Sequence, residues 1–334
     1  MSASVAPALI VAIDTEGDNQ WDPAARRRQT FANVHALDRL HEFFARHDVR
    51  PTYVVTHPVS EDARSAGVLR HLLSLGGCEI GAHHHAWETP PFEPGDVDRH
   101  PYALSLPHAQ FEAQIEALTA SIHRNIGVRP LSYRSGRFGF SASHVSALER
   151  LGYRVDSSVT PLFYEAHKGG PDFVRAPLTP YFLAYDDATR PGTSAVLEVP
   201  VSAALSRRVP AWMERCYGHL PRPYTTKRLL RLARIAEVRW LRPSYSSAAD
   251  MIALARQLVD RHVPLLNVIF HSSEAIVGGS PYNRSEAELA AFFERLSQLL
   301  RFSLKELGAR PQTLTEFHDG YVHRPGSAPG PAAG

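Results

Sequence analysis

The stretch Ala8-Leu9-Ile10-Val11-Ala12-Ile13, followed by Asp14-Thr15-Glu16-Gly17-Asp18, is the most informative part of this 334-residue chain. A continuous apolar run of this length is typical of a strand that is covered on both faces of a parallel sheet. The acidic residues come where this strand is expected to end. We therefore predict an α/β protein that carries polar residues at the carboxyl ends of its strands.

Strands and helices alternate along the chain after this stretch. Strands are predicted at 52–56, 78–85, 131–134 and 153–156, and apolar residues at helical spacing precede each of them. The same alternation returns after residue 245, with a helix from Ser247, a strand at 264–271 and a further helix. This last helix begins at a capping box, Ser285-x-x-Glu288. This order predicts a parallel sheet with right-handed crossovers.

Residues 157–245 interrupt the alternation, and we interpret them as an insertion that covers one end of the sheet. They include a predicted strand at 196–201 and a basic helical stretch near Lys227–Arg239. Residues 1–318 are expected to form a single domain, with a last strand at Gln312–Phe317. From Asp319 onward the Gly/Pro/Ala tail has little to bury, so we expect residues 319–334 to be disordered.

Composition excludes several classes of protein. Hydrophobic residues make up 44% and charged residues 21%, as in soluble globular proteins, and a net charge of +2 indicates no general attraction to nucleic acid. The two cysteines argue against a disulfide framework. The apolar run from Pro7 to Ile13 is too short for a signal peptide or a membrane span. We therefore expect a cytoplasmic protein without a transmembrane segment, whose oligomeric state the sequence does not indicate.

The stretch Ile80-Gly81-Ala82-His83-His84-His85-Ala86-Trp87 carries the clearest chemistry. Side chains alternate between the faces of a strand, so His83 and His85 point to one side and His84 to the other. Neutral imidazole is the commonest protein ligand for zinc and its neighbours. The spacing predicts that His83 and His85 bind one metal ion, although 18 histidines also produce some clusters by chance.

Polar residues stand at or just beyond the ends of five predicted strands: Asp14, Glu16, His83, His85, Arg134, Asp156 and His271. In a barrel of parallel strands these ends meet on one face, where active sites draw residues from several strands. A protein core whose buried polar groups are simply hydrogen-bonded does not explain titratable groups at so many strand ends. We interpret the set as one active site.

Over roughly residues 8–317 the chain resembles the polysaccharide deacetylases of the NodB-homology group, the family-4 carbohydrate esterases. The matching motifs, in the family's order, are Asp14–Asp18, Glu79–His83, Tyr133-Arg134, Asp156 and Val268-Ile269-Phe270-His271. This resemblance implies a distorted (β/α)₇ barrel with an inserted segment. It also implies a metal-dependent hydrolase that removes an N-acetyl group from an acetamido sugar.

Two positions depart from the usual family pattern. The acids stand at 14, 16 and 18 rather than adjacent, and Trp87 occupies the place of the second histidine. Residues two apart on a strand share a face, so both sets can still act together. A subgroup linked to lipopolysaccharide and capsule sugar modification resembles the chain more closely, including H-x-H-x-W and Pro90-Pro91-Phe92. This subgroup implies a role in surface polysaccharide or lipopolysaccharide biosynthesis.

The resemblance also implies a metal site. Glu16, His83 and His85 would hold a divalent ion, with Asp18 as the alternative acidic ligand; strand parity favours Glu16. We expect Zn²⁺, and Co²⁺, Ni²⁺ and Fe²⁺ suit the same ligands. Because His84 points away from His83 and His85, loss of His84 should leave metal binding nearly intact, whereas loss of either neighbour should abolish it.

The remaining catalytic roles also follow from the resemblance. Asp14 would be the base, Arg134 would keep its carboxylate ionised, and His271 would protonate the departing amine. Asp156 either orients His271 or begins the local turn at Ser157-Ser158. Arg134 has the alternative of a surface ion pair.

Substrate contacts are predicted at two places. Trp87 suits stacking on a sugar ring, or else packs in the core. The basic stretch 207–242, with ten Arg/Lys against two Glu, is either a solvated face or a surface for a nucleotide- or lipid-linked sugar or a peripheral membrane contact.

Two other functions compete with deacetylation. An amidohydrolase-like hydrolase of small amides also uses H-x-H at a strand end. A candidate for a carboxylated lysine would favour this function, but no lysine precedes Lys168. A non-catalytic carbohydrate-binding barrel is the alternative outside enzymes.

Overall fold

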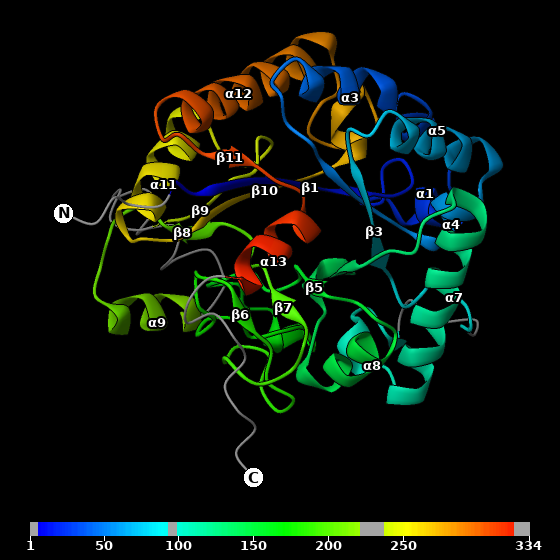
Figure 1. The fold of residues 1–334 in the computed structure, drawn as a ribbon, viewed down its shortest axis with the longest axis horizontal. Helices are drawn as coiled ribbons and strands as arrows, with labels where there is room; N and C mark the ends of the chain where they lie inside the picture. Colours follow the sequence, from blue (N-terminus) through cyan, green and yellow to red (C-terminus); the bar gives the residue numbers. More distant parts are fainter. Residues whose placement is uncertain (1–5, 93–98, 221–236, 324–334) are drawn as a thin grey trace.

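The computed structural model describes residues 6–92, 99–220 and 237–323. Its main sheet contains seven parallel strands in the order β10 (Leu265–His271), β1 (Ala8–Thr15), β2 (Thr52–Val55), β3 (Glu79–His84), β4 (Ser132–Ser135), β5 (Val155–Asp156) and β7 (Leu197–Glu198). β6 (Tyr181–Phe182) extends the sheet antiparallel to β7, and β11 (Arg310–Pro311) pairs with the start of β1. The predicted α/β class and distorted barrel are confirmed (Figure 1).

Strand β1 lies at the centre of this arrangement. All eight of its residues are buried, because β10 and β2 flank it and helices cover the sheet. The parallel register places Asp14 beside His271 on β10 and, two strands away, His83 of β3 beside Arg134 of β4. Residues from distant parts of the sequence therefore meet at the carboxyl ends of the strands.

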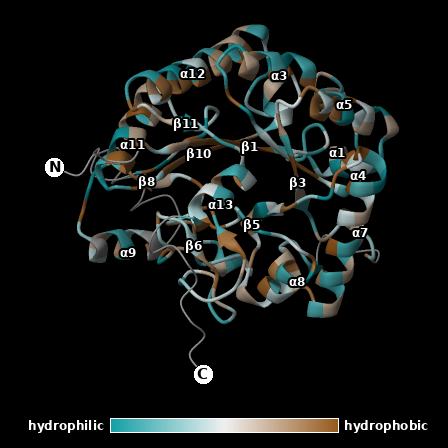
Figure 2. Ribbon diagram, viewed as in Figure 1, coloured by the Kyte–Doolittle hydropathy of each residue, from teal (hydrophilic) through white to brown (hydrophobic). Residues whose placement is uncertain are grey.

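Helices surround the strands (Figure 1). Apolar residues follow the strands and the inward faces of these helices, and hydrophilic residues lie outside (Figure 2). Gly127, at a φ of 89°, ends the long helix that directly precedes β4, as the sequence predicts. In the described ranges the helices are α1 (Pro23–Arg27), α2 (Ala32–His35), α3 (Leu37–Ala45), α4 (His57–Glu61), α5 (Ala63–Ser74), α7 (His108–Ile126), α8 (Val145–Arg150), α9 (Ala211–His219), α11 (Ala248–Asp260), α12 (Glu286–Lys305) and α13 (Leu314–Val322).

Asn267 bridges the open side of the barrel between β7 and β10. Its side-chain nitrogen donates to the carbonyl oxygens of Val199 and Pro200, each at 3.2 Å. Its backbone nitrogen donates to the hydroxyl of Ser202 at 2.8 Å. The side-chain nitrogen is thereby satisfied inside an otherwise apolar strand, because it supplies the hydrogen bonds that a neighbouring strand would make, whereas Oδ1 has no partner among the described residues.

The segment 157–245 takes part in the barrel as well as in its cover. It contains β7, and it also forms a two-stranded antiparallel sheet of β8 (Ala203–Leu205) and β9 (Val238–Trp240). Most of the basic stretch near Lys227–Arg239 lies outside the described residues, so the predicted membrane or anion contact there stays a prediction. Within the described part of the chain, no helix is both long and apolar enough to cross a bilayer.

The prediction of a strand at Gln312–Phe317 is wrong. The hydroxyl of Thr313 accepts from the backbone nitrogen of Glu316, and the Glu316 side chain bonds back, so a capping box begins α13. The carboxylate of Glu79 accepts from the backbone nitrogen of Thr315 at 2.9 Å, which ties this helix to the amino end of β3. α13 continues to Val322, past the predicted start of the tail, and residues 324–334 are outside the described chain.

Candidate active site

A pocket of about 600 Å³ opens at the carboxyl ends of the strands. Six of the predicted site residues line it: Asp14, Glu16, His83, His85, Trp87 and His271. Arg134 lies fully buried behind Asp14, and Asp156 is also fully buried and does not line the pocket. The convergence of strand ends that the sequence predicts is therefore present.

Glu16, His83 and His85 form a buried group whose ligand atoms all lie within 4.8 Å of one another. The Glu16 Oε2 atom is 3.0 Å from His85 Nε2 and 3.8 Å from His83 Nε2. The Nδ1 atom of His83 lies 3.1 Å from the carbonyl oxygen of Arg134. Because a carbonyl can only accept, this contact places the proton on Nδ1 and leaves the Nε2 lone pair facing Glu16.

The electrostatics of this group suit a cation. Burial lowers the pKa of His83 to about 4 and that of His85 to about 3, so both rings are neutral at pH 7. Burial also raises the pKa of Glu16, which forms no ion pair with an arginine or lysine in the described residues. Two neutral imidazoles and a buried carboxylate are a donor set that fits a divalent transition metal.

The orientation of the neighbouring residues agrees with strand parity. His84 points to the other side of β3, where its ring nitrogens contact the Gln114 amide oxygen at 2.7 Å and the Tyr133 hydroxyl at 3.2 Å. The Asp18 carboxylate accepts from the backbone nitrogens of Ala32 and Asn33 instead of facing the histidines. Glu16, and not Asp18, therefore lies with the imidazoles.

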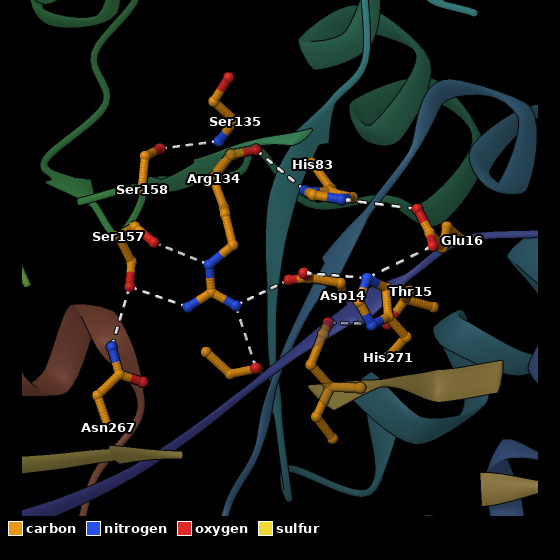
Figure 3. Close-up of polar contacts among 12 residues, drawn as sticks. Asp14, Thr15, Glu16, His83, Arg134, Ser135, Ser157, Ser158, Asn267 and His271 are labelled. Carbon is orange, nitrogen blue, oxygen red and sulfur yellow. Dashed lines mark hydrogen bonds and ion pairs between the residues drawn. The ribbon is translucent and has the colours of Figure 1, made fainter. Parts of the chain in front are cut away.

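Asp14 is held by a buried guanidinium (Figure 3). Arg134 Nη1 donates to Asp14 Oδ1 at 2.8 Å, while its other nitrogens donate to the backbone and side chain of Ser157 at 2.8 and 2.9 Å. Burial acts to raise the pKa of Asp14, but the charges of Arg134 and nearby histidines outweigh it and hold the pKa well below its usual range. Asp14 is thus ionised throughout the neutral range.

His271 is oriented by an ion pair that the sequence did not reveal to us. Its Nδ1 lies 2.8 Å from Glu274 Oε1 and 3.0 Å from Arg242 Nη2, and Arg242 also pairs with Glu274. Its Nε2 faces Asp14 Oδ2 at 3.7 Å and Glu16 Oε1 at 3.6 Å. Burial acts to lower the pKa of His271, but these three carboxylates reverse that effect and raise the pKa.

Asp156 makes its hydrogen bonds away from His271. Its Oδ1 accepts from the hydroxyl of Ser158 at 2.6 Å, which is the local turn that we considered as one alternative. Asp156 also lies against Glu198. The pKa of Glu198 is raised well above its usual range, first by burial and then by the charge of Asp156. The orienting contact predicted for Asp156 is made by Glu274, because Glu274 follows His271 in the same turn.

Aromatic side chains form much of the rest of the pocket wall. The ring of Trp87 lies 4.3 Å from that of His85, and the guanidinium of Arg137 lies 4.5 Å above it. The other aromatic lining residues come from five separate segments and were not predicted: Trp21, Tyr102, Phe138, Phe163, Trp240 and Tyr245. Such walls suit the apolar faces of sugar rings.

Signals in the sequence existed for some of the missed residues. His271-Ser272-Ser273-Glu274 has the spacing of a capping box, with a glutamate three residues after the first position. Arg242 was hidden inside a stretch that we treated as uniformly basic. Trp21 follows the acidic loop by only three residues, yet nothing in its spacing distinguishes a pocket residue from a core residue.

Comparison with solved structures supports the fold. The chain is similar to a proposed polysaccharide deacetylase from Mycobacterium smegmatis, at 15% identity over 96% of this chain and 92% of that one, with a TM-score of 0.53. It is also similar to a proposed glycoside hydrolase/deacetylase from Parabacteroides distasonis, at 13% identity over 98% and 74%, with a TM-score of 0.63. The predicted resemblance to polysaccharide deacetylases is confirmed at the level of the fold.

The fold alone leaves the reaction open. A 4-alpha-glucanotransferase from Thermococcus litoralis also matches, at 12% identity over 95% of this chain and 41% of that one, with a TM-score of 0.52. No family model matches the chain, and no curated protein matches it. Choosing among reactions therefore rests on the residues of the pocket.

Proposed function

We propose that this protein is a metal-dependent N-deacetylase that hydrolyses the acetamido group of a sugar. One observation carries the proposal: an ionised Asp14 and a His271 with a raised pKa stand 3.7 Å apart beside the group of Glu16, His83 and His85. Amide hydrolysis at neutral pH needs a base for water, an acid for the amine and a means of activating the carbonyl.

Glu16, His83 and His85 are the residues that would hold the metal ion. A divalent ion bound there supplies a Lewis acid and lowers the pKa of water. The carbonyl of Arg134 fixes the ring of His83 in the tautomer that can bind, since it accepts from Nδ1. We expect Zn²⁺, with Co²⁺, Ni²⁺ or Fe²⁺ suited to the same donors.

Asp14 acts as the base in this proposal. Its Oδ1 is occupied by Arg134, so Oδ2, on the His271 side, is the oxygen that accepts the proton of the attacking water. The three protein groups that Arg134 also contacts, among them the carbonyl of Ala12 at 3.1 Å, fix the guanidinium in place. Asp156 remains in the proposal only as a carboxyl behind Arg134 and not as a group that contacts the substrate.

His271 acts as the acid. Glu274 accepts from Nδ1 and leaves the protonated Nε2 directed at the pocket, where it can give its proton to the departing sugar amine. Burial acts to raise the pKa of Glu274, but Arg242 and His271 lower it to about 2, so its charge persists over the working pH range. The imidazolium therefore has a permanent buried counter-ion.

The proposed substrate is an N-acetylated sugar from surface polysaccharide or lipopolysaccharide assembly, linked to a nucleotide or a lipid. Support comes from the aromatic pocket wall, which Trp87 shares with Trp240 and Tyr245, and from the resemblance of the sequence motifs. Arg137 covers part of the Trp87 ring, so we propose that sugar stacking falls mainly to the unpredicted aromatic residues.

The site disfavours glycosyl transfer and the amidohydrolase alternative. Glycosidic chemistry needs one carboxylic acid and one carboxylate but no metal ligands, whereas here Glu16, the carboxyl with the raised pKa, faces two neutral imidazoles that suit a metal ion. Among the described residues the lysines are Lys168 and Lys305; Lys168 lines the pocket but pairs with Glu165, and neither lies on a strand, which disfavours a carboxylated bridge at a strand end. A non-catalytic barrel would have no use for a His271 held by buried charges.

Acetate release from a panel of acetamido sugars tests this function. We expect release by the protein loaded with Zn²⁺, and loss of at least 100-fold in the Asp14→Asn variant, since general base catalysis contributes about 10²–10⁴-fold. An Asp38→Asn variant is a control, because Asp38 lies in α3 and does not line the pocket. Undiminished release by Asp14→Asn would contradict the assignment.

A further inference from the structure

Two arginines of the pocket wall are not used by the chemistry described above. Arg26 lies in the last turn of α1, after β1, and Arg137 lies in the short 3₁₀ turn Gly136–Phe138 that follows β4. Both line the pocket, on segments that the barrel brings together from opposite parts of the chain. Neither contributes to the metal group or to the acid and base.

Neither arginine forms an ion pair with an acid in the described chain. The other cations of the wall are neutralised, since Lys168 pairs with Glu165 at 3.1 Å and Arg242 pairs with Glu274. Among the described residues, Arg26 Nε has no hydrogen-bond partner. Within the same part of the chain, Arg137 donates to the carbonyl oxygen of Pro101 at 3.2 Å, which does not neutralise its charge. The wall therefore carries two guanidinium groups that no carboxylate of the described residues meets at ion-pair distance, although Glu16 acts on Arg137, and Arg26 on Glu88, over a longer range.

The two guanidinium groups act on the same region. Burial and then the like charge of Arg26 lower the pKa of Arg137, and after burial both arginines contribute to lowering the pKa of His85. Like charges held near each other in a partly buried wall are unfavourable unless a ligand of opposite charge joins them.

The backbone of Arg137 is also strained. Its φ of 53° and ψ of 21° lie in the left-handed region, and Phe138 follows with a φ of 57°. Residues other than glycine occupy this region at a cost, and such costs concentrate at binding sites. Here the guanidinium lies over the ring of Trp87, although the residue as a whole is exposed.

We propose that Arg26 and Arg137 form an anion subsite, which selects acetamido sugars that carry a phosphate or carboxylate group next to the sugar. The proposal rests on the proposed function for the position of the sugar, and it specifies the substrate class. Guanidinium groups bind such oxygens with two parallel hydrogen bonds, and a neutral sugar gives these charges nothing to bind. The subsite places anion recognition in the pocket, separate from the basic stretch 207–242.

The test compares substrates that differ only in charge. We would measure kcat/KM for N-acetylglucosamine, for its 1-phosphate and for an N-acetylated hexosaminuronic acid, using the full chain loaded with Zn²⁺. The 1-phosphate joined to a nucleotide or to a short water-soluble prenyl chain then separates the two sources of a diphosphate. We expect at least one anionic sugar to exceed the neutral sugar by about tenfold or more, with a preference that falls as salt is added.

Variants locate the effect. In the Arg26→Gln/Arg137→Gln double variant, the ratio of kcat/KM for the anionic over the neutral sugar should fall by about 10- to 100-fold, the range of one to two charge-assisted hydrogen bonds. Arg27→Gln is the matched control, because Arg27 is the exposed neighbour on α1 and does not line the pocket. A ratio that is the same in wild type and double variant would overturn the subsite.

A binding measurement separates this inference from the proposed function. Calorimetric titration with N-acetylglucosamine 1-phosphate should give a Kd that weakens about tenfold or more in the double variant and not in Arg27→Gln. Arginine-dependent binding without hydrolysis of any sugar would refute the deacetylase and keep the subsite. Hydrolysis of neutral sugars with neither anion preference nor arginine-dependent binding would refute the subsite and keep the deacetylase.

Discussion

Replacement of Glu274 by glutamine tests how the site keeps an acid at neutral pH. Glu274 is fully buried, and its Oε1 lies 2.8 Å from Nδ1 of His271. The variant keeps the size of the side chain and removes its charge. Arg242, which the carboxylate now neutralises, would then face the His271 ring with an uncompensated charge at 3.0 Å.

The direction of the effect follows from the sign of the pKa shift. In the native protein the pKa of His271 is raised, so the imidazolium is present below that pKa and is lost as the pH rises through it. Loss of the Glu274 charge lowers this pKa. A hydrogen bond to a charged group contributes about 1.5–3 kcal/mol, and one pKa unit corresponds to about 1.36 kcal/mol. We therefore expect a fall of about one to two pKa units.

The pH profile of kcat/KM for acetate release reports this change. In Glu274→Gln the alkaline limb should move to lower pH by about one to two units. At pH values above the native limb the activity should therefore fall about 10- to 100-fold, and at pH values below the shifted limb it should fall much less. Glu286→Gln serves as the control, because Glu286 is exposed on α12. An alkaline limb at the native pH, or an equal loss at every pH, would refute the proposed role of the Glu274 charge.

Three further predictions concern the metal group. His84→Ala should keep one bound Zn²⁺ per chain while His83→Ala loses it, as measured by elemental analysis after gel filtration; the reverse result would show that strand parity misassigns the ligands. Gly136→Ala should weaken Zn²⁺ binding, because a Cβ there would lie 2.1 Å from Nδ1 of His85. Gly67→Ala in α5, where a Cβ would have no contact closer than 3.8 Å, is the control and should raise the free energy of unfolding by up to about 1 kcal/mol. Equal Zn²⁺ affinity in the two variants would contradict this prediction. Metal retention in dialysis should persist below about pH 6.5 and fail in acid, because burial lowers the pKa of His83 to about 4 and raises that of Glu16, and both groups bind only while unprotonated; loss already near pH 6.5 would indicate an ordinary histidine.

The sequence predicted the features that depend on local pattern. The apolar run of β1 indicated a buried parallel strand, and all eight residues of β1 are buried. Strand parity placed His83 and His85 on one side and His84 on the other, because alternation along a strand needs no knowledge of the partners. Parity could not separate Glu16 from Asp18, which are two residues apart; Asp18 is drawn away from the histidines because its carboxylate accepts from the backbone nitrogens of Ala32 and Asn33 at a helix start that the sequence did not specify.

Features that depend on contacts between distant segments were missed. Glu274 follows His271 closely, but its role arises only because Arg242, from the interrupted region, reaches the same carboxylate. The sequence analysis assigned no role to Asn267, whose bonds to Val199 and Pro200 bridge the barrel. Such pairings leave no periodic trace in one sequence, since either partner alone reads as an ordinary polar residue.

Local signals also misled where two of them competed. The segment Gln312–Phe317 alternates apolar and polar residues weakly, and this suggested a strand. The capping box of Thr313 and Glu316 and the contact with Glu79 determine a helix instead, because they satisfy the first backbone nitrogens of α13. Tertiary contacts at the amino end of the barrel therefore override the short alternating pattern.

The central claim is that Glu16, His83 and His85 hold a metal ion that amide hydrolysis by Asp14 and His271 requires. The most direct test measures metal content and acetate release together on the purified chain, before chelation, after chelation and after reconstitution with Zn²⁺, Co²⁺, Ni²⁺ or Fe²⁺. We predict one ion per chain and acetate release that chelation abolishes and reconstitution restores in the native protein but not in His271→Ala. A chain that binds no metal after reconstitution, or that releases acetate equally well without it, would contradict the claim.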